Sequence, residues 1–356
     1  MNSKYFYHDM PLFGLDIGSS TIKVMQISKD NKKYEIQGYG ICEFNESATN
    51  DGVIIDHKLL AESAVKLFKD ELVGEIDTRR VAISVPATKT YTRTIELPLI
   101  KDDEVPDAVR IEAEQYIPMS IDELYLDHSI ISRTEDTIEV LAVATPKKII
   151  DSRIELCRIL DLEPIAFDTT ILSAARLFER QEENSDIPAV LVDFGSVSTE
   201  ITVYDKTIIV TGTIMGGGDV FTENIAKELS VSREEAHIIK TKYGMGRSQK
   251  QAQVLKAIEP VVNQLGKEIQ RMIRYHEERS GAKEKIGQII TMGGGANLPG
   301  LSDYFTNMLR LPVRTCDPLS NFDYGKLKPP SNLERSIYAT SAGLALIQPT
   351  ELFKND

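Results

Sequence analysis

Hydrophobic and polar positions in the first hundred residues alternate mostly with the period of β-strands. Apolar and β-branched runs predict five strands there: Leu12–Ile17, Thr21–Ile27, Tyr34–Cys42, Arg80–Val85 and Tyr91–Leu97. Between the third and the fourth, apolar residues spaced three and four apart predict a helix over about 57–69. The chain therefore begins with a strand-rich unit that carries one helix.

Later segments alternate between the period of helices and the period of strands. Helices are predicted from Lys101 to the residue before Pro118, and over 147–160, 169–178, 220–243, 249–280, 298–309 and 335–346. Strands are predicted over 138–144, 164–167 and 286–292, and a second strand-rich stretch starts at Ala189. Strands that alternate with helices predict an α/β fold. The polar segment 181–188 interrupts the pattern and predicts a boundary between two lobes.

One motif occurs twice, near the start of each predicted lobe. Asp16-Ile-Gly18-Ser19-Ser20 and Asp193-Phe-Gly195-Ser196 each follow an apolar strand and precede a β-branched one. Glycine lets the backbone approach a ligand closely, turn N–H groups converge on an anion, and hydroxyls add donors. The pair predicts two turns that hold one nucleotide triphosphate between the lobes. For either turn taken alone, an ordinary hairpin is the alternative, because such turns are common.

The aspartates of the motif need a different role, because a carboxylate repels phosphate. Asp16 and Asp193 are candidates for holding hydrated Mg²⁺, which takes few protein ligands and keeps several waters. Lys23, in the first returning strand, could bring positive charge to the phosphates.

Two glycine clusters add candidates. Gly216, Gly217 and Gly218 precede a predicted helix, where a glycine turn can bind phosphate. Gly293, Gly294 and Gly295, followed by Ala296, lie between a predicted strand and a helix, where a flat backbone could pass under an adenine ring. Neither cluster has the spacing of the dinucleotide-binding fingerprint.

Charge and composition limit the classes of partner. Lys and Arg number 41 and Asp and Glu 54, so the net charge is −13, and no basic block offsets it. Nucleic acid requires a basic footprint and an anionic membrane repels such a chain, so we expect neither nucleic-acid binding nor direct membrane insertion. No apolar run approaches the roughly 18 residues of a membrane span, and the N-terminus lacks signal-peptide features. The three cysteines lie far apart, which is typical of structural thiols in a reducing cytoplasm.

The order of these motifs resembles that of the superfamily of actin, heat-shock chaperones and sugar kinases. Within it the chain most resembles the type IV pilus assembly protein PilM family, which is itself similar to the division protein FtsA. The narrower match rests on Phe13–Lys23, Leu97–Pro118, Asp127–Ile130, Ala142–Lys147 and Leu162–Asp168.

The resemblance implies an actin-like (ribonuclease H-like) α/β fold of two lobes with a duplicated βββαβα core. After an N-terminal extension at 1–10, lobe 1 would cover 11–188 and include an FtsA-type small subdomain at about 98–145. Lobe 2 would cover 189–356 and include a helical subdomain at about 220–285.

The resemblance also implies an ATP site with Mg²⁺ at Asp16 and Asp193. The phosphates would be surrounded by Gly18, Ser19, Ser20, Lys23, Gly195, Ser196, Gly216, Gly217 and Gly218, and the adenosine bordered by Gly293, Gly294, Gly295 and Ala296. Asp168 matches the position where hydrolysing relatives orient the attacking water. Capping the helix that follows Asp168 is an equal alternative.

His237 is a departure from the pattern, because relatives such as FtsA usually carry a glutamate there that touches the ribose. A neutral imidazole can still bond a ribose hydroxyl. Lys240, in the same motif, could pack its stem on the adenine. For both side chains a solvated helix face is the alternative.

The expected partner is the N-terminal cytoplasmic peptide of the membrane protein PilN, bound in a groove whose wall we expect at 91–118. Other pilus assembly proteins and self-association are further expectations. The protein would be cytoplasmic, held at the inner membrane by its partners, with at most slow, regulatory ATP hydrolysis. An FtsA-like membrane-associated cytoskeletal or division ATPase is the main alternative, but segment 348–356 lacks the amphipathic character of such an anchor. A small-molecule kinase would need a base, for which only Asp168 is a candidate.

Overall fold

The computed structural model describes residues 10–30, 33–181, 187–279 and 285–348. The predicted N-terminal extension lies, apart from Met10, outside the described residues, as do most of the polar segment 181–188 and the end of the chain.

Six strands form the first sheet, in the order β11-β7-β1-β2-β3-β6. β1 (Phe13–Ile17), β2 (Thr21–Asp30) and β3 (Lys33–Glu43) form an antiparallel meander, and β6 (Leu72–Gly74) pairs with β3. β7 (Arg80–Val85) and β11 (Glu163–Thr169) run parallel to β1. α1 (His57–Lys66) and α3 (Lys147–Leu160) cover one face of this sheet with apolar side chains such as Leu60 and Leu156.

The second sheet repeats this topology, in the order β14-β13-β12-β15-β16. β12 (Ala189–Phe194), β13 (Ser198–Asp205) and β14 (Thr207–Met215) form the meander, and β15 (Gln288–Met292) and β16 (Val313–Thr315) run parallel to β12. This repetition is the duplicated core that the resemblance implies.

The helices between β14 and β15 differ from the prediction. The helical stretch predicted over 220–243 consists of two helices, because α5 (Gly218–Leu229) and α6 (Arg233–Lys242) are separated at Ser230, which has a left-handed backbone. Ser232 then caps α6 by accepting a hydrogen bond from Glu235 N. α7 (Gln251–Arg279) and α8 (Leu301–Leu309) follow.

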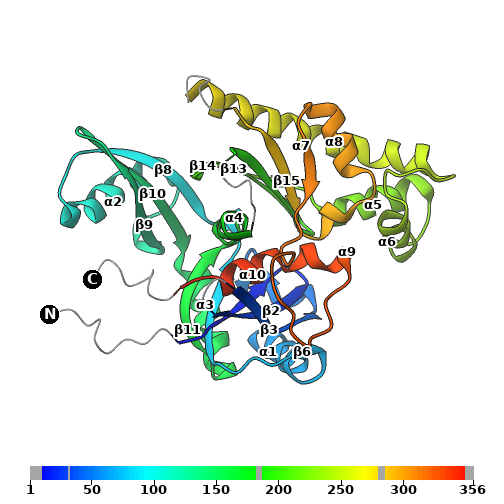
Figure 1. Ribbon diagram of the computed structural model, residues 1–356, viewed down its shortest axis with the longest axis horizontal. Helices are drawn as coiled ribbons and strands as arrows, with labels where there is room; N and C mark the ends of the chain where they lie inside the picture. Colours follow the sequence, from blue (N-terminus) through cyan, green and yellow to red (C-terminus); the bar gives the residue numbers. More distant parts are fainter. Residues whose placement is uncertain (1–9, 31–32, 182–186, 280–284, 349–356) are drawn as a thin grey trace.

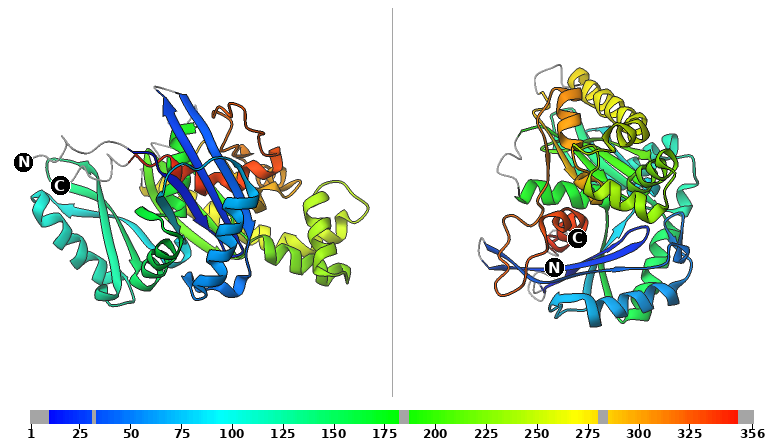
Figure 2. Two further views of the ribbon diagram at one scale, coloured as in Figure 1. Left: turned by 90° about the horizontal axis from the view of Figure 1, so that it is seen from below. Right: turned by 90° about the vertical axis from the view of Figure 1, so that its right-hand side faces the viewer.

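Two helices lie between the sheets, as Figure 1 and the right-hand view of Figure 2 show: α4 (Thr170–Gln181) and α10 (Ala339–Ala345), the latter preceded by α9 (Asn332–Arg335). One apolar cluster includes Met25 of the first sheet, Phe178 of α4 and Leu191 of the second sheet. Glycines permit this close packing, since a Cβ on Gly14 would lie 2.2 Å from a carbonyl oxygen of α10 and one on Gly343 2.0 Å from a carbonyl oxygen of α4. The lobes therefore share a continuous core.

A third sheet stands beside the two lobes (Figure 1). β8 (Tyr91–Pro98), β10 (Thr137–Pro146) and β9 (Leu124–Arg133) form it in that order, and α2 (Val105–Tyr116) packs on one face. We call β8, β9, β10 and α2 the small subdomain. Its sheet starts at Tyr91, ahead of the expected start at about 98, and β9 was not among the predicted strands.

Candidate functional site

The two repeated turns have the same local geometry. Gly18 N donates to Thr21 O at 2.9 Å, and Gly195 N donates to Ser198 O at 3.0 Å. In the strand pairs that flank them, Asp16 stands opposite Lys23 and Asp193 stands opposite Glu200. The repeat seen in the sequence is therefore a repeat of hydrogen bonding as well.

The turns face each other across the two lobes. Ser19 Oγ and Ser196 Oγ are in hydrogen-bond contact, although 177 positions separate them in the chain. Both hydroxyls are only partly buried. The structure therefore brings the two predicted turns together. We call this the closed arrangement, because a phosphate bound between the turns would have to replace the contact of Ser19 with Ser196.

The first glycine loop packs on the second turn. Gly218 N donates to Gly195 O at 2.9 Å, and Asp219 N donates to Ser196 O at 2.9 Å. A Cβ on Gly217 would lie 2.3 Å from Gly195 O, so only glycine fits there. The N–H groups of Gly218 and Asp219 are thus already used to hold the turn.

Lys240 and His237 lie on α6, beside this loop. Lys240 Nζ donates to Gly218 O at 2.8 Å and to Thr222 Oγ1 at 2.7 Å, and burial lowers its pKa. The ammonium group therefore supports the loop. The alternative of a solvated helix face is wrong for Lys240. His237 is exposed, and desolvation followed by the charge of Lys240 lowers its pKa, which favours the neutral imidazole.

The late glycine cluster also reaches the site. Gly293 has a φ of 78°, and a Cβ there would lie 2.2 Å from Asp193 Oδ1. Gly294, Gly295 and Ala296 continue as a short 3₁₀ turn, in which Gly294 is exposed and Ala296 is buried. The second aspartate and the predicted adenosine border therefore lie side by side.

Three carboxylates gather where the turns meet. Lys23 Nζ pairs with Asp16 Oδ2 at 2.9 Å. Burial and then the charge of Asp16 raise the pKa of Asp193 to about 6. Burial and then Asp193 raise the pKa of Glu200 to about 8, while Thr170 Oγ1 donates to Glu200 Oε2 at 2.6 Å. Burial is the main cause of both raised pKa values and the neighbouring carboxylates add to it, so a cation bound here would favour the ionised forms.

Such a donor set fits a divalent cation. Among the described residues, no three His, Cys, Asp or Glu side chains form a ready-made ligand set. Mg²⁺ does not need one, since it is usually bound by one or two carboxylates, waters and substrate phosphates. Asp16 and Asp193 would hold it, and it would neutralise charge on phosphate.

Asp168 lies at the carboxyl end of β11, opposite Ser84 of β7. Its Oδ2 accepts hydrogen bonds from Arg176 Nη1 at 2.6 Å and from Ser173 Oγ at 3.3 Å. Thr169 Oγ1 accepts the bond from Leu172 N and caps α4, so the capping alternative for Asp168 is wrong.

Glu200 was missed by the sequence analysis, although a signal existed. It follows Asp193 at the same interval at which Lys23 follows Asp16, and it is an acidic residue within a β-branched strand. Arg176, the partner of Asp168, had no comparable signal, because its contact depends on how α4 packs.

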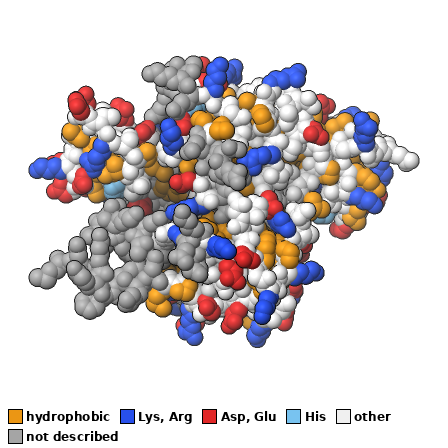
Figure 3. All heavy atoms as spheres, viewed as in Figure 1, with side chains coloured by type: hydrophobic (Ala, Val, Ile, Leu, Met, Phe, Trp, Pro, Cys, Tyr) orange, Lys and Arg blue, Asp and Glu red, His pale blue; other side chains and the backbone are white. Residues whose placement is uncertain are grey.

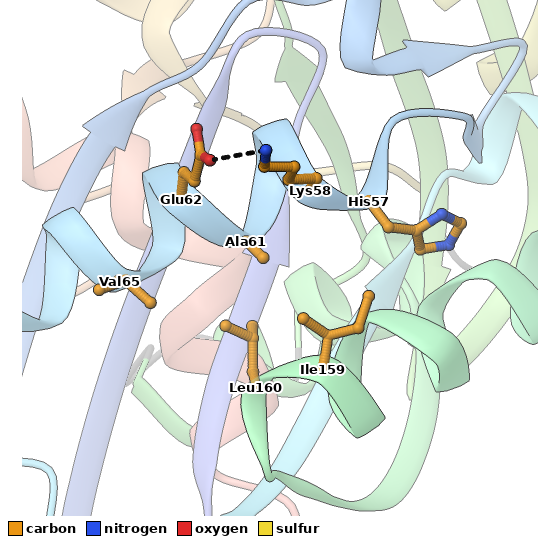
Figure 4. A pocket seen from close by; sticks show the side chains of 7 residues that line it. All are labelled: His57, Lys58, Ala61, Glu62, Val65, Ile159 and Leu160. Carbon is orange, nitrogen blue, oxygen red and sulfur yellow. Dashed lines mark ion pairs between the residues drawn. The ribbon is translucent and has the colours of Figure 1, made fainter.

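A pocket of about 590 Å³ opens elsewhere, between α1 and α3 (Figure 4). Its lining is mostly apolar and consists of His57, Lys58, Ala61, Glu62, Val65, Ile159 and Leu160. None of these residues belongs to the facing turns or the glycine loops, so the pocket is separate from the candidate nucleotide site.

The surface adds little to this picture. On the face drawn in Figure 3, Lys and Arg side chains are scattered among Asp and Glu. In the described part of the chain, no helix is both long and apolar enough to cross a membrane.

Comparisons with known proteins agree with the expected fold. The family model described as type IV pilus assembly protein PilM matches residues 14–348. A solved PilM–PilN type IV pilus biogenesis complex is similar with a TM-score of 0.82 at 23% identity, over 95% of this chain and 98% of that one. MreB5 of Spiroplasma citri bound to AMPPNP is similar with a TM-score of 0.53 at 13% identity, over 98% and 97%. These likenesses confirm the actin-like fold.

Curated relatives are more distant in sequence. The cell division protein FtsA of Streptococcus pneumoniae serotype 2 (strain D39) is 22% identical over 348 residues, which cover 86% of this chain and 75% of that protein. FtsA of Borreliella burgdorferi is 23% identical over 352 residues, which cover 87% and 85%.

Proposed function

We propose that this chain, which belongs to the type IV pilus assembly protein PilM family, binds ATP with Mg²⁺ between its two phosphate turns. It would serve as the actin-like, ATP-binding component of the inner-membrane platform that assembles type IV pili. The observation that carries the proposal is the contact of Ser19 with Ser196, which places turns from both lobes at one point.

Binding would rearrange the contacts now made within the site. A triphosphate would separate Ser19 from Ser196, and Lys23 would turn from Asp16 towards phosphate as Mg²⁺ takes over that carboxylate. The other predicted contacts are proposed as before: Gly18, Ser20, Gly195 and Gly216–Gly218 at the phosphates, and His237, Lys240 and Gly293–Ala296 at the adenosine. Gly218 N would have to exchange its bond to Gly195 O for one to phosphate, and Lys240 would offer its stem while its ammonium group still bonds the loop.

The partner we propose is the cytoplasmic N-terminal peptide of PilN. Support comes from family membership and from the similar solved structure, which is a PilM–PilN complex. The protein would then be cytoplasmic and held at the inner membrane through this partner. An FtsA-like role has less support, because the FtsA relatives are only about a fifth identical, whereas the PilM family model spans residues 14–348.

Nucleotide binding is proposed with slow turnover. Asp168 is buried and its Oδ2 is held by Arg176 and Ser173, so only Oδ1 could orient a water, and water has little access to it. The Asp168 carboxylate is therefore poorly placed for fast hydrolysis in the closed arrangement.

Isothermal titration of the purified, nucleotide-free chain with ATP, with Mg²⁺ or with EDTA, tests the proposal. We expect binding that requires Mg²⁺ and weakens at least about tenfold in Asp16→Asn, because one charged ligand is lost. Asp303→Asn, at an exposed position on α8, is the matched control and should bind like the parent. A parent protein that binds no ATP in the presence of Mg²⁺ would overturn the proposed function.

A further inference from the structure

Two short segments join the small subdomain to lobe 1. The outgoing segment runs from the end of β7 at Val85 to β8, and the returning one passes from β10 directly into α3 at Lys147. Thr145 Oγ1 donates to Thr90 Oγ1 at 3.4 Å, so the two segments touch. Any rotation of the small subdomain relative to lobe 1 must act on these segments.

Arg153 of α3 bonds to the backbone just before the outgoing segment and just after the returning one. It is 2% exposed, and its Nε donates to Ser84 O at 2.8 Å, next to the outgoing segment. Its Nη1 donates to Ile149 O at 3.1 Å, in the first turn of the returning helix, and to Gly52 O at 2.9 Å. Gly52 lies in the turn between β4 (Thr49–Asn50) and β5 (Val53–Ile54). One planar guanidinium therefore ties α3 to the end of β7 and to the turn between β4 and β5, while its bond to Ile149 O stays within α3.

Ser84 connects this arrangement to the first phosphate turn. The Ser84 carbonyl receives the bond from Arg153, and the Ser84 hydroxyl receives one from Ile17 N at 2.9 Å. Ile17 stands between Asp16 and Gly18. Burial lowers the pKa of Arg153 to about 10, and the negative charge of Asp16 partly opposes this by stabilising the Arg153 cation.

The same helix touches the small subdomain itself. Tyr125 of β9 donates its hydroxyl to Asp151 Oδ1 at 3.0 Å, and Lys147 Nζ lies 5.6 Å from the centre of the Tyr125 ring. Asp151 precedes Arg153 by two residues. α3 therefore contacts the small subdomain through Asp151. About half a helical turn later it contacts, through Arg153, the residue Ser84 that bonds the first phosphate turn.

We propose that Arg153 is a positioning residue that couples the orientation of the small subdomain to the first phosphate turn. The inference rests on the proposed ATP site. Entry of a triphosphate must part Ser19 from Ser196, which moves the turn that Ser84 holds through Ile17. A buried guanidinium cannot leave its carbonyl partners without a large desolvation cost, so α3, into which the returning segment runs, moves with Ser84. ATP binding and the orientation of the small subdomain, where we place the peptide partner, would then change together.

Spin-label distances measure this coupling. Labels at Glu62→Cys on α1 and Glu135→Cys on the exposed turn between β9 and β10 report the orientation of the small subdomain, and the native cysteines are buried. In an otherwise unchanged chain we expect ATP with Mg²⁺ to shift the distance distribution.

Two substitutions should suppress the shift. Arg153→Lys keeps the charge but cannot bond three carbonyl groups in one plane, and Ser84→Ala removes the acceptor of Ile17 N while leaving the bond from Arg153 to the Ser84 carbonyl. For each we expect ATP affinity to fall about 5- to 20-fold, within the usual range of coupling between sites, and the ATP-dependent shift to disappear. A purely structural role would lower the melting temperature but leave the shift in place.

Arg158→Lys, on the exposed face of the same helix, is the control and should change neither quantity. If the parent binds ATP but its distance distribution does not move, or if it still moves in both variants, the coupling inference is overturned while the ATP site stands. Absence of ATP binding in the parent would instead overturn the proposed function and this inference with it. Should Arg153→Lys fail to fold, Ser84→Ala still decides, since it leaves the Arg153 bonds intact.

Discussion

Replacement of Glu200 by glutamine should make the protein more stable than the parent at alkaline pH. The Glu200 carboxylate is buried, accepts a hydrogen bond from Thr170 Oγ1 and lies close to Asp193. Burial, followed by the charge of Asp193, raises its pKa from 4.5 to about 8. Glutamine has nearly the same shape and can still accept the Thr170 hydroxyl, so the substitution removes the charge and little else.

The sign of the effect follows from proton linkage. A carboxyl whose pKa is raised by folding holds its proton more tightly in the folded state, so its stability contribution is fully present below about pH 4.5 and is lost as the pH rises through about 8. The difference between 4.5 and about 8 is about 3.5 units, which at about 1.4 kcal/mol per unit gives a ceiling of about 5 kcal/mol. Coupling to Asp193 and local hydration reduce this, and we expect about 2–4 kcal/mol at pH 9.

Thermal unfolding in EDTA, without nucleotide, measures the difference. An unfolding entropy of about 2.1 cal/mol/K per residue gives about 0.75 kcal/mol/K for a chain of this length, so about 3 kcal/mol corresponds to about 4 °C. Glu200→Gln should therefore melt about 3–5 °C above the parent at pH 9 and within about 1 °C of it at pH 5. Glu223→Gln, at an exposed position on α5, should follow the parent at both pH values. A constant gap between Glu200→Gln and the parent, or a lower melting temperature at pH 9, would refute the reasoning.

Three further outcomes are expected. Gly217→Ala should displace the loop, because its Cβ would lie 2.3 Å from Gly195 O, and calorimetry should show ATP affinity reduced at least about tenfold. Gly294→Ala is the comparison: the nearest neighbour of its Cβ lies 3.7 Å away, so this variant should retain more affinity. Gly343→Ala places a Cβ 2.0 Å from a carbonyl oxygen of α4 and should cost about 2–4 kcal/mol in urea unfolding; an unchanged midpoint would contradict the packing. All three cysteines are buried, and burial raises the pKa of Cys157 to about 12, so a thiol reagent should label none of them in the native protein and all three in urea. Rapid labelling of the native protein would show that the described burial is wrong.

The fold could be predicted where burial imposes a clear period. The strand over 80–85 and the helix over 147–160 have the predicted bounds, because each presents apolar residues to the core at regular spacing. β9 escaped prediction because it is the last strand of a three-stranded sheet, with most of its side chains partly or fully exposed, so its sequence does not alternate. The division between α5 and α6 was missed because Ser230 interrupts the helical backbone while the apolar spacing continues across it.

The site could be predicted best where the sequence repeats itself or gathers glycines. The Asp-x-Gly-Ser motif predicted two similar turns, and the structure brings them together through Ser19 and Ser196. Arg153 carried no local signal, because its two partners outside its own helix come from positions 52 and 84, and only the folded chain makes them neighbours. Asp168 was placed correctly at the end of a strand, but its ion pair depends on the direction in which α4 leaves that strand.

The internal repeat also explains why the site is asymmetric in charge. The position opposite the first aspartate holds Lys23, whereas the equivalent position opposite the second holds Glu200. Lobe 1 therefore brings an ammonium group that can turn to phosphate, and lobe 2 brings a second carboxylate whose charge the protein itself leaves uncompensated. At neutral pH Glu200, whose pKa burial and then Asp193 raise to about 8, mostly holds a proton, whereas Asp193, with a pKa of about 6, is mostly ionised and can bind a cation. Mg²⁺ would bind the carboxylates and the triphosphate would bind the Lys23 ammonium group, while the two ions also neutralise each other. Their joint binding should therefore be more favourable than the binding of either one alone.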